Sequence, residues 1–154
     1  MLSKNIINLF KEEKPRFLLG ISGLIPFLLP ALGIWFLNYE YYNYLFVVFK
    51  IYASLIITFL SGIHWGIAMG SSKLNKAIWP YVLAILPSII VLCLNLYDKN
   101  ILFLVVIFFL FNIVLILDYI FKKMVLISEF YFQLRIFLTI SVNLSILSFI
   151  VKVF

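Results

Sequence analysis

The chain has 154 residues, of which 66% are apolar and 12% are charged, and its mean hydropathy is +1.19. A soluble domain carries roughly 45–50% apolar and about 25% charged residues, so water is excluded as the solvent for most of this chain. The formal charge of +6 comes from basic residues spread between apolar blocks, which argues against nucleic acid as a partner. We therefore expect an all-α integral membrane protein with the lipid bilayer as its first partner.

The N-terminal residues 1–16 are polar and basic enough to form a cytoplasmic tail. Leu2, Ile6, Leu9 and Phe10 fall on one face of a helix, which predicts a short amphipathic helix on the membrane surface. A frayed tail is the alternative.

Five apolar blocks follow, each near the roughly 20 residues that a helix needs to cross a bilayer. The first is longer than the roughly 7–15 residues of a signal-peptide core, so we expect a retained span. Short polar connections make successive spans antiparallel, and residues 17–154 are predicted to form one bundle of five transmembrane helices. The blocks are Phe17–Leu37, Leu45–Gly70, Ile78–Leu96, Ile101–Ile120 and Phe132–Val151.

The basic residues are distributed unequally between the two ends of the predicted spans. Of the 12 Lys and Arg, only Lys50, Lys99 and Lys152 lie at the end opposite to the N-terminal tail. Lys and Arg are enriched in cytoplasmic connections, so the sequence predicts a cytoplasmic N-terminus and an external C-terminus.

The second block carries a small residue at every fourth position, which places these residues along one ridge of a helix. Small side chains let a neighbouring helix backbone approach closely, so we expect this ridge to pack against another helix. Its residues are Ser54, Thr58, Gly62, Gly66 and Gly70.

His64 lies on the opposite side of the same block, near Ser61. An imidazole in hydrocarbon needs a hydrogen-bond partner. A neutral histidine bonded to Ser61, to a carbonyl or to another span is one interpretation. A proton relay or ligand contact is the second, because histidine changes protonation readily near neutral pH. Metal ligation is the third.

Asp118 and Arg135 are charged residues near the ends of the fourth and fifth blocks that face the cytoplasm. Antiparallel packing brings them to the same depth, where they can pair. Equally, Asp118 can pair with Lys122 one helical turn on, while Arg135 extends to the lipid headgroups. The sequence leaves both arrangements open.

The fifth block has a polar ridge at fourth-residue spacing, comprising Tyr131, Arg135, Thr139 and Asn143. A polar ridge is predicted to face the bundle and to bond neighbouring helices. Together these positions predict a polar pocket open to the cytoplasm. Its candidate residues are His64, Ser61, Asp118, Arg135 and Thr139.

Metal and cofactor sites receive little support from composition. One Cys and one His cannot supply the three or four ligands of a zinc site, and a haem between two histidines is excluded within one chain. We expect neither a metal nor a cofactor.

Several strings resemble the domain of unknown function 3429 family, which includes transmembrane protein 69. The second block contains Tyr52-Ala-Ser-Leu-Ile-Ile-Thr-Phe-Leu-Ser-Gly-Ile-His-Trp-Gly66, which is similar to the family hallmark. Matching elements are Gly23-Leu-Ile-Pro-Phe27, Pro87-Ser88, Asp118 and Phe130-Tyr-Phe-Gln-Leu-Arg-Ile-Phe-Leu-Thr139. Thr58, Ser61 and Phe130 depart from the family pattern, where Ser, Gly and Trp are expected. The resemblance implies a small bacterial inner-membrane protein and implies no activity.

Three functions are compatible with these patterns. The first is a non-enzymatic accessory or assembly factor that acts through helix–helix contacts with other membrane proteins or in a homo-oligomer. The second is a small-solute or proton-linked transporter that uses the pocket around His64, Asp118 and Arg135. The third is a membrane-embedded enzyme acting on lipid or quinone headgroups, with His64 as its general base.

Overall fold

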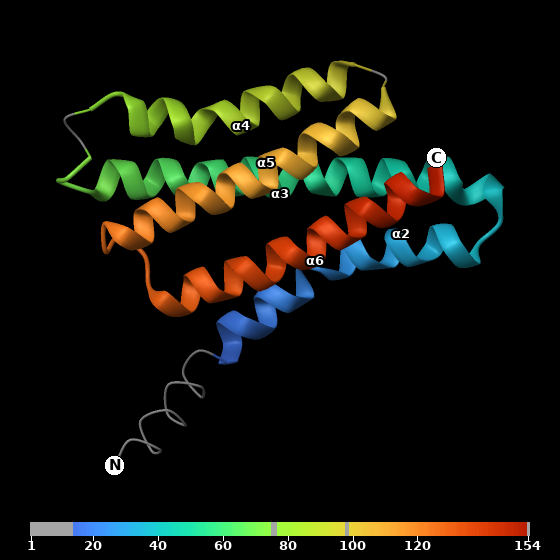
Figure 1. The fold of residues 1–154 in the computed structure, drawn as a ribbon, viewed down its shortest axis with the longest axis horizontal. Coiled ribbons are helices and arrows are strands. Elements are labelled where there is room, and N and C mark those ends of the chain that lie inside the picture. The colour runs from blue at the N-terminus through green and yellow to red at the C-terminus, as the bar shows by residue number, and fades with distance from the viewer. Residues whose placement is uncertain (1–13, 75–76, 98, 154) are drawn as a thin grey trace, which may run out of the picture.

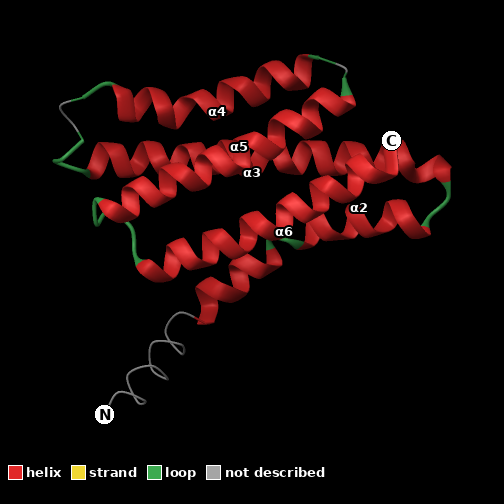
Figure 2. Ribbon diagram, viewed as in Figure 1, coloured by secondary structure: helices red, strands yellow, loops and turns green. Residues whose placement is uncertain are grey.

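The computed structural model describes residues 14–74, 77–97 and 99–153, and these are helical except for short connections (Figure 2). Residues 14–22 form a helical segment that a turn at Gly23 and Leu24 separates from α2. The later elements are α2 (Ile25–Phe36), the single 3₁₀ turn η1 (Tyr39–Tyr41), α3 (Tyr42–Gly70), α4 (Trp79–Leu96), α5 (Asn100–Lys123) and α6 (Glu129–Val153).

The predicted five-span architecture is confirmed. The described residues contain five helices long and apolar enough to cross a membrane. The first, Lys14–Phe36, includes the turn at Gly23. The cytoplasmic position of the N-terminus stays a prediction, and most of the predicted amphipathic tail lies outside the described residues.

Successive spans run in opposite directions and form two groups (Figure 1). Helices α4, α3 and α2 lie side by side, and α5 and α6 cross over them, with α5 against α3 and α6 against α2. The connections after Gly70 and after Lys123 lie at one end of the bundle, and the helical segment 14–22 bends away from the bundle on the side nearer to this end, which we call the N-terminal end. The C-terminus lies at the other end.

The centre of the bundle is a cluster of phenylalanine rings from four helices. Phe27 of α2 packs edge-on against Phe49 of α3 and Phe111 of α5, with ring centroids 5.5 and 5.9 Å apart. The ring of Phe149 of α6 is tilted against that of Phe49, with their centroids 4.6 Å apart. Edge-to-face pairs of this kind stabilise a packed core beyond their buried area, so these rings tie the two groups of helices together.

Two local features accompany the break before α2, which borders the candidate site: a proline at the start of α2 and a hydrogen bond from α3. Pro26 occupies the first turn of α2, where its missing N–H costs no helix hydrogen bond. Tyr52 of α3 donates a hydrogen bond of 2.9 Å to the carbonyl oxygen of Gly23. The broken segment is therefore fastened to α3, and residues 14–22 leave the bundle axis at this point (Figure 1).

Candidate functional site

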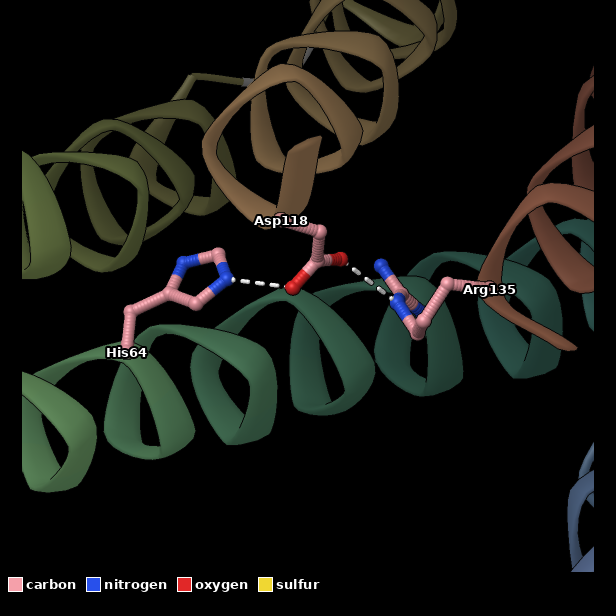
Figure 3. A network of polar contacts seen from close by, with 3 residues as sticks. All are labelled: His64, Asp118 and Arg135. Carbon is pink, nitrogen blue, oxygen red and sulfur yellow. Dashed lines mark hydrogen bonds and ion pairs between the residues drawn. The ribbon is translucent and has the colours of Figure 1, made fainter. Parts of the chain in front are cut away.

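Asp118 of α5 accepts hydrogen bonds from two other helices at once (Figure 3). Its Oδ1 lies 2.8 Å from His64 Nε2 of α3, and its Oδ2 lies 2.9 Å from Arg135 Nε of α6. A carboxylate accepts and does not donate, so Nε2 is the histidine nitrogen that carries the hydrogen. Three residues that are far apart in sequence thus form one network, the His64–Asp118–Arg135 triad.

The triad is buried: His64 is 1%, Asp118 is 0% and Arg135 is 6% exposed. Each residue stands five or six positions from the end of its helix, or about 8–9 Å along the axis at 1.5 Å per residue. The three side chains therefore meet at a common depth, near the N-terminal end. Residues of the predicted polar pocket are brought together as the antiparallel packing required.

Of the two arrangements that the sequence left open for Asp118, the structure contains the pair with Arg135. Lys122 instead pairs with Glu129 of α6 at 2.7 Å, in an exposed position. Arg135 is turned into the bundle and does not extend toward the headgroups.

Ser61 and Thr139, the other predicted pocket residues, are also buried, at 3% and 2% exposure. Ser61 does not hold the imidazole, because its hydroxyl has no hydrogen-bond partner among the described residues. Phe121 was not among the predicted site residues, although its ring packs edge-on against that of His64 with centroids 5.2 Å apart. Its position three residues after Asp118, on the same face of α5, was the available signal.

Several buried polar atoms near the triad lack a partner among the described residues. Those on the predicted pocket and polar ridge are His64 Nδ1, Ser61 Oγ, Tyr131 OH, Arg135 Nη2, Thr139 Oγ1 and Asn143 Oδ1. Native proteins leave few buried polar atoms unpaired, so each such atom calls for an explanation. Two of these atoms, His64 Nδ1 and Arg135 Nη2, belong to the triad itself, so its hydrogen-bonding capacity is not used up among the described residues.

Two cavities lie on opposite sides of the triad. One, of about 180 Å³, is bounded by α3, α4 and α5 and is lined by His64, with Leu74 and Met124 of the connections at its border. The other, of about 220 Å³, lies between residues 19–27, α3 and α6 and is lined by Arg135 and Thr139. Asp118 therefore links a histidine on one cavity to an arginine on the other.

The small-residue ridge of α3 is largely uncovered. Thr58, Gly62, Gly66 and Gly70 are exposed, and a Cβ added at any of the three glycines would meet no heavy atom within 4 Å. Ser54, at the far end, is the exception, since its hydroxyl accepts a hydrogen bond from Asn95 of α4. No described helix of this chain covers the glycines, so the predicted packing partner of this ridge stays a prediction.

The polar ridge of α6 faces the bundle, as expected. Arg135 and Thr139 are buried, Tyr131 and Asn143 are half-buried, and the Asn143 amide donates to Asn112 of α5 at 3.2 Å. Within residues 14–74, 77–97 and 99–153, no three His, Cys, Asp or Glu side chains gather in a metal-binding group.

Five spanning helices closed around a buried histidine–carboxylate–arginine network define a multi-pass, helical-bundle membrane protein. The model of the family described as "protein of unknown function (DUF3429)" matches residues 13–151, and the chain belongs to this family. The resemblance seen in the sequence is thereby confirmed at the level of the family. No curated protein and no solved structure matches the chain.

Proposed function

We propose that the protein is a non-enzymatic accessory or assembly factor of a bacterial inner membrane. The small-residue ridge of α3 docks a helix of another membrane protein. The observation that carries this proposal is the bare surface over Gly62, Gly66 and Gly70, where nothing in the described chain lies within 4 Å of an added Cβ.

The fold of the single chain gives no reason for these glycines. None has the positive φ that favours glycine, and none receives a neighbouring side chain at close range. Gly62 and Gly66 lie inside α3, where a glycine costs roughly 0.5–1 kcal/mol relative to alanine, whereas Gly70 is its last residue. Small residues four apart are what a closely approaching transmembrane helix requires, so a helix from outside this chain accounts for all three.

Photo-crosslinking in native membranes tests this proposal. A photoreactive residue replaces Met69, which flanks the ridge, and a second variant carries it at Leu92 on the exposed face of α4. We expect a discrete heteromeric adduct from position 69 and none from position 92. Gly66→Leu should remove the adduct because its side chain keeps the partner backbone away, whereas Leu92→Phe should leave it.

Two outcomes would count against the accessory role. An adduct that persists in Gly66→Leu would show that the ridge is not the contact. An adduct with twice the mass of the chain would assign the ridge to a homo-oligomer.

A proton-linked carrier is the second candidate, favoured by the position of His64. Its Nδ1 has no described partner, and its ring borders the 180 Å³ cavity next to Leu74 and Met124 at the N-terminal end. The distribution of basic residues predicts that this end is cytoplasmic, so the histidine could exchange a proton with the cytoplasm. The charge on the imidazole would then change its electrostatic interaction with Asp118.

Reconstituted liposomes with an entrapped pH dye test the carrier. His64→Gln should lose most of the proton flux driven by a pH gradient, while Ser141→Ala should retain it, because that hydroxyl bonds only its own helix at Phe137. Equal fluxes in His64→Gln and in the unaltered protein would rule out this role.

A further inference from the structure

The 220 Å³ cavity on the arginine side of the triad is lined almost entirely by apolar residues, with a few polar side chains from α6. Most of its lining residues are apolar and come from the helical segment 14–22, α2, α3, α5 and α6. Gly20 and Gly23 also line it. Leu19 and Phe59 belong to this lining and are 73% and 64% exposed. Both are on membrane-spanning helices, so the cavity opens sideways toward lipid tails.

Three polar groups of α6 line this apolar cavity at successive turns: Tyr131, Arg135 and Thr139. Arg135 and Thr139 are more than nine-tenths buried, and Arg135 Nη2, Thr139 Oγ1 and Tyr131 OH all lack a described partner. Each of the three groups carries a hydrogen to donate, and guanidinium can only donate. Arg135 Nη2 therefore requires a hydrogen-bond acceptor, and the Tyr131 and Thr139 hydroxyls can each donate to one as well.

The size of the cavity limits what the acceptor can belong to. A dry cavity of about 150 Å³ accommodates benzene, so 220 Å³ holds a group somewhat larger than one six-membered ring. A two-chain phospholipid does not fit inside. The head of a lipid fits, provided that it is compact and that its tail leaves between Leu19 and Phe59.

The charge of the site selects among compact acceptors. Asp118 already balances Arg135 through the 2.9 Å contact, so with a neutral His64 the triad has no net charge. Burying an additional anion here would leave its charge uncompensated in a low-dielectric medium, which is costly. A neutral carbonyl oxygen accepts the same hydrogen bonds without this cost.

We propose that this cavity is a lateral binding site for a membrane amphiphile with a compact neutral head that contains a carbonyl group, whose oxygen atoms accept hydrogen bonds from the donors of Arg135, Tyr131 and Thr139. The carbonyl belongs to a quinone-type ring or to the ester of a single-chain glycerolipid. The mouth of this site at Phe59 lies beside the small-residue ridge of α3, but its polar groups are all on α6, so binding of the probes is measured without reference to the accessory role.

Calorimetric titration of the full chain in phosphatidylcholine nanodiscs, corrected for empty nanodiscs, tests the site. The probes are decyl-benzoquinone, monodecanoylglycerol, decanoate and decylbenzene. We expect saturable binding of at least one carbonyl probe, and the one that binds identifies the source of the carbonyl. Decylbenzene, which has the ring and tail but no acceptor, should bind more weakly.

Conservative variants separate hydrogen bonding from general packing. Thr139→Val and Tyr131→Phe should each raise the Kd of the carbonyl probe by about two- to tenfold, as expected for one lost hydrogen bond. Ser141→Ala is the matched control on the same helix and should leave the Kd unchanged, because its hydroxyl bonds its own backbone. The melting temperature of each variant shows that the fold is retained.

Four results would overturn the proposal. One is decylbenzene binding as tightly as the carbonyl probes, which would make the cavity an apolar void. Another is an unchanged Kd in both Thr139→Val and Tyr131→Phe. The third is that neither carbonyl probe binds saturably. The fourth is tighter binding of decanoate, because its carboxylate would be buried without a compensating charge.

Discussion

Asp118 holds three helices through its two oxygen atoms, and neither oxygen reaches solvent. A buried ion pair is not by itself a strong source of stability, because removing both charges from water costs nearly as much as their attraction returns. Breaking the pair is different, since it leaves one charge buried without compensation. The triad is therefore a feature whose partial loss is far more damaging than its complete replacement.

We predict that Asp118→Asn lowers the free energy of unfolding by about 3–5 kcal/mol, because Arg135 is left buried without a carboxylate. Thermal unfolding in mild detergent, followed by circular dichroism, measures the loss. Glu129→Gln removes the carboxylate of an exposed ion pair with Lys122 and should change the melting temperature little.

Replacing both charged partners provides the complementary measurement. Asp118→Leu combined with Arg135→Met should recover much of the stability lost in Asp118→Leu alone, because no buried charge remains unpaired. A double variant as unstable as the single one would show that packing, rather than charge, explains the loss.

The members of the triad could be identified from the sequence, but their pairing could not. A charge or an imidazole inside a span is costly and therefore conspicuous, which singles out His64, Asp118 and Arg135. Lys122, one turn after Asp118, was as good a partner by helical spacing as Arg135 was by common depth. The sequence does not show that Glu129 of the next helix engages Lys122, while Asp118 pairs with Arg135.

At the scale of elements, the connection between α5 and α6 contains a strained residue. Val125 has a φ of 60°, in the left-handed region, and is 84% exposed. A β-branched side chain in this region is a genuine outlier, with a cost of roughly 1–2 kcal/mol. The turn is nevertheless held, because the Val125 and Leu126 amides bond to Lys122 and Phe121 carbonyls, and Lys73 donates to that of Met124.

We predict that Val125→Gly raises the melting temperature, because glycine adopts this backbone conformation without strain and no buried contact is lost. Val125→Ala is the matched control: it removes the branched side chain while retaining a Cβ in the left-handed region. It should recover less stability than glycine. A melting temperature lowered by Val125→Gly would show that the strain is absent or that the side chain contributes an important contact.

The α3 ridge illustrates what periodicity reveals about an element and what it does not. Fourth-residue spacing correctly places Thr58, Gly62 and Gly66 on one face, because 3.6 residues make a helical turn. It says nothing about which neighbour lies opposite. In this chain α4 reaches the ridge only at Ser54, and no described helix lies within 4 Å of a Cβ added at Gly62, Gly66 or Gly70.

At the scale of the whole molecule, the number of spans followed from the sequence and their arrangement did not. Composition distinguishes a membrane-embedded chain from a water-soluble one very well. It separates a lipid-facing leucine from a core leucine poorly, since both surroundings are apolar. Leu29 at 63% exposure and Leu104 at 0% are indistinguishable by hydropathy, so the crossing of α6 over α2 was not predictable.

Topology is the prediction that belongs to this scale. In a Cys93→Ser background, we expect Lys73→Cys to react with an impermeant thiol reagent only from the cytoplasmic side and Tyr41→Cys only from outside. The two positions lie at opposite ends of α3, and the excess of Lys and Arg lies at the end of Lys73. Labelling of both from the same side would refute the five-span arrangement, and reversed labelling would refute the orientation.

The triad also has a consequence for biosynthesis. Asp118 enters the membrane before Arg135, which is made 17 positions later on the last helix. Until that helix is inserted, the carboxylate can be met only by the imidazole of an earlier span and by Lys122, which the absence of Glu129 leaves available one turn on. A nascent chain that stops short of α6 thus lacks the guanidinium that completes the network, and the junction of three helices closes only after α6 is made.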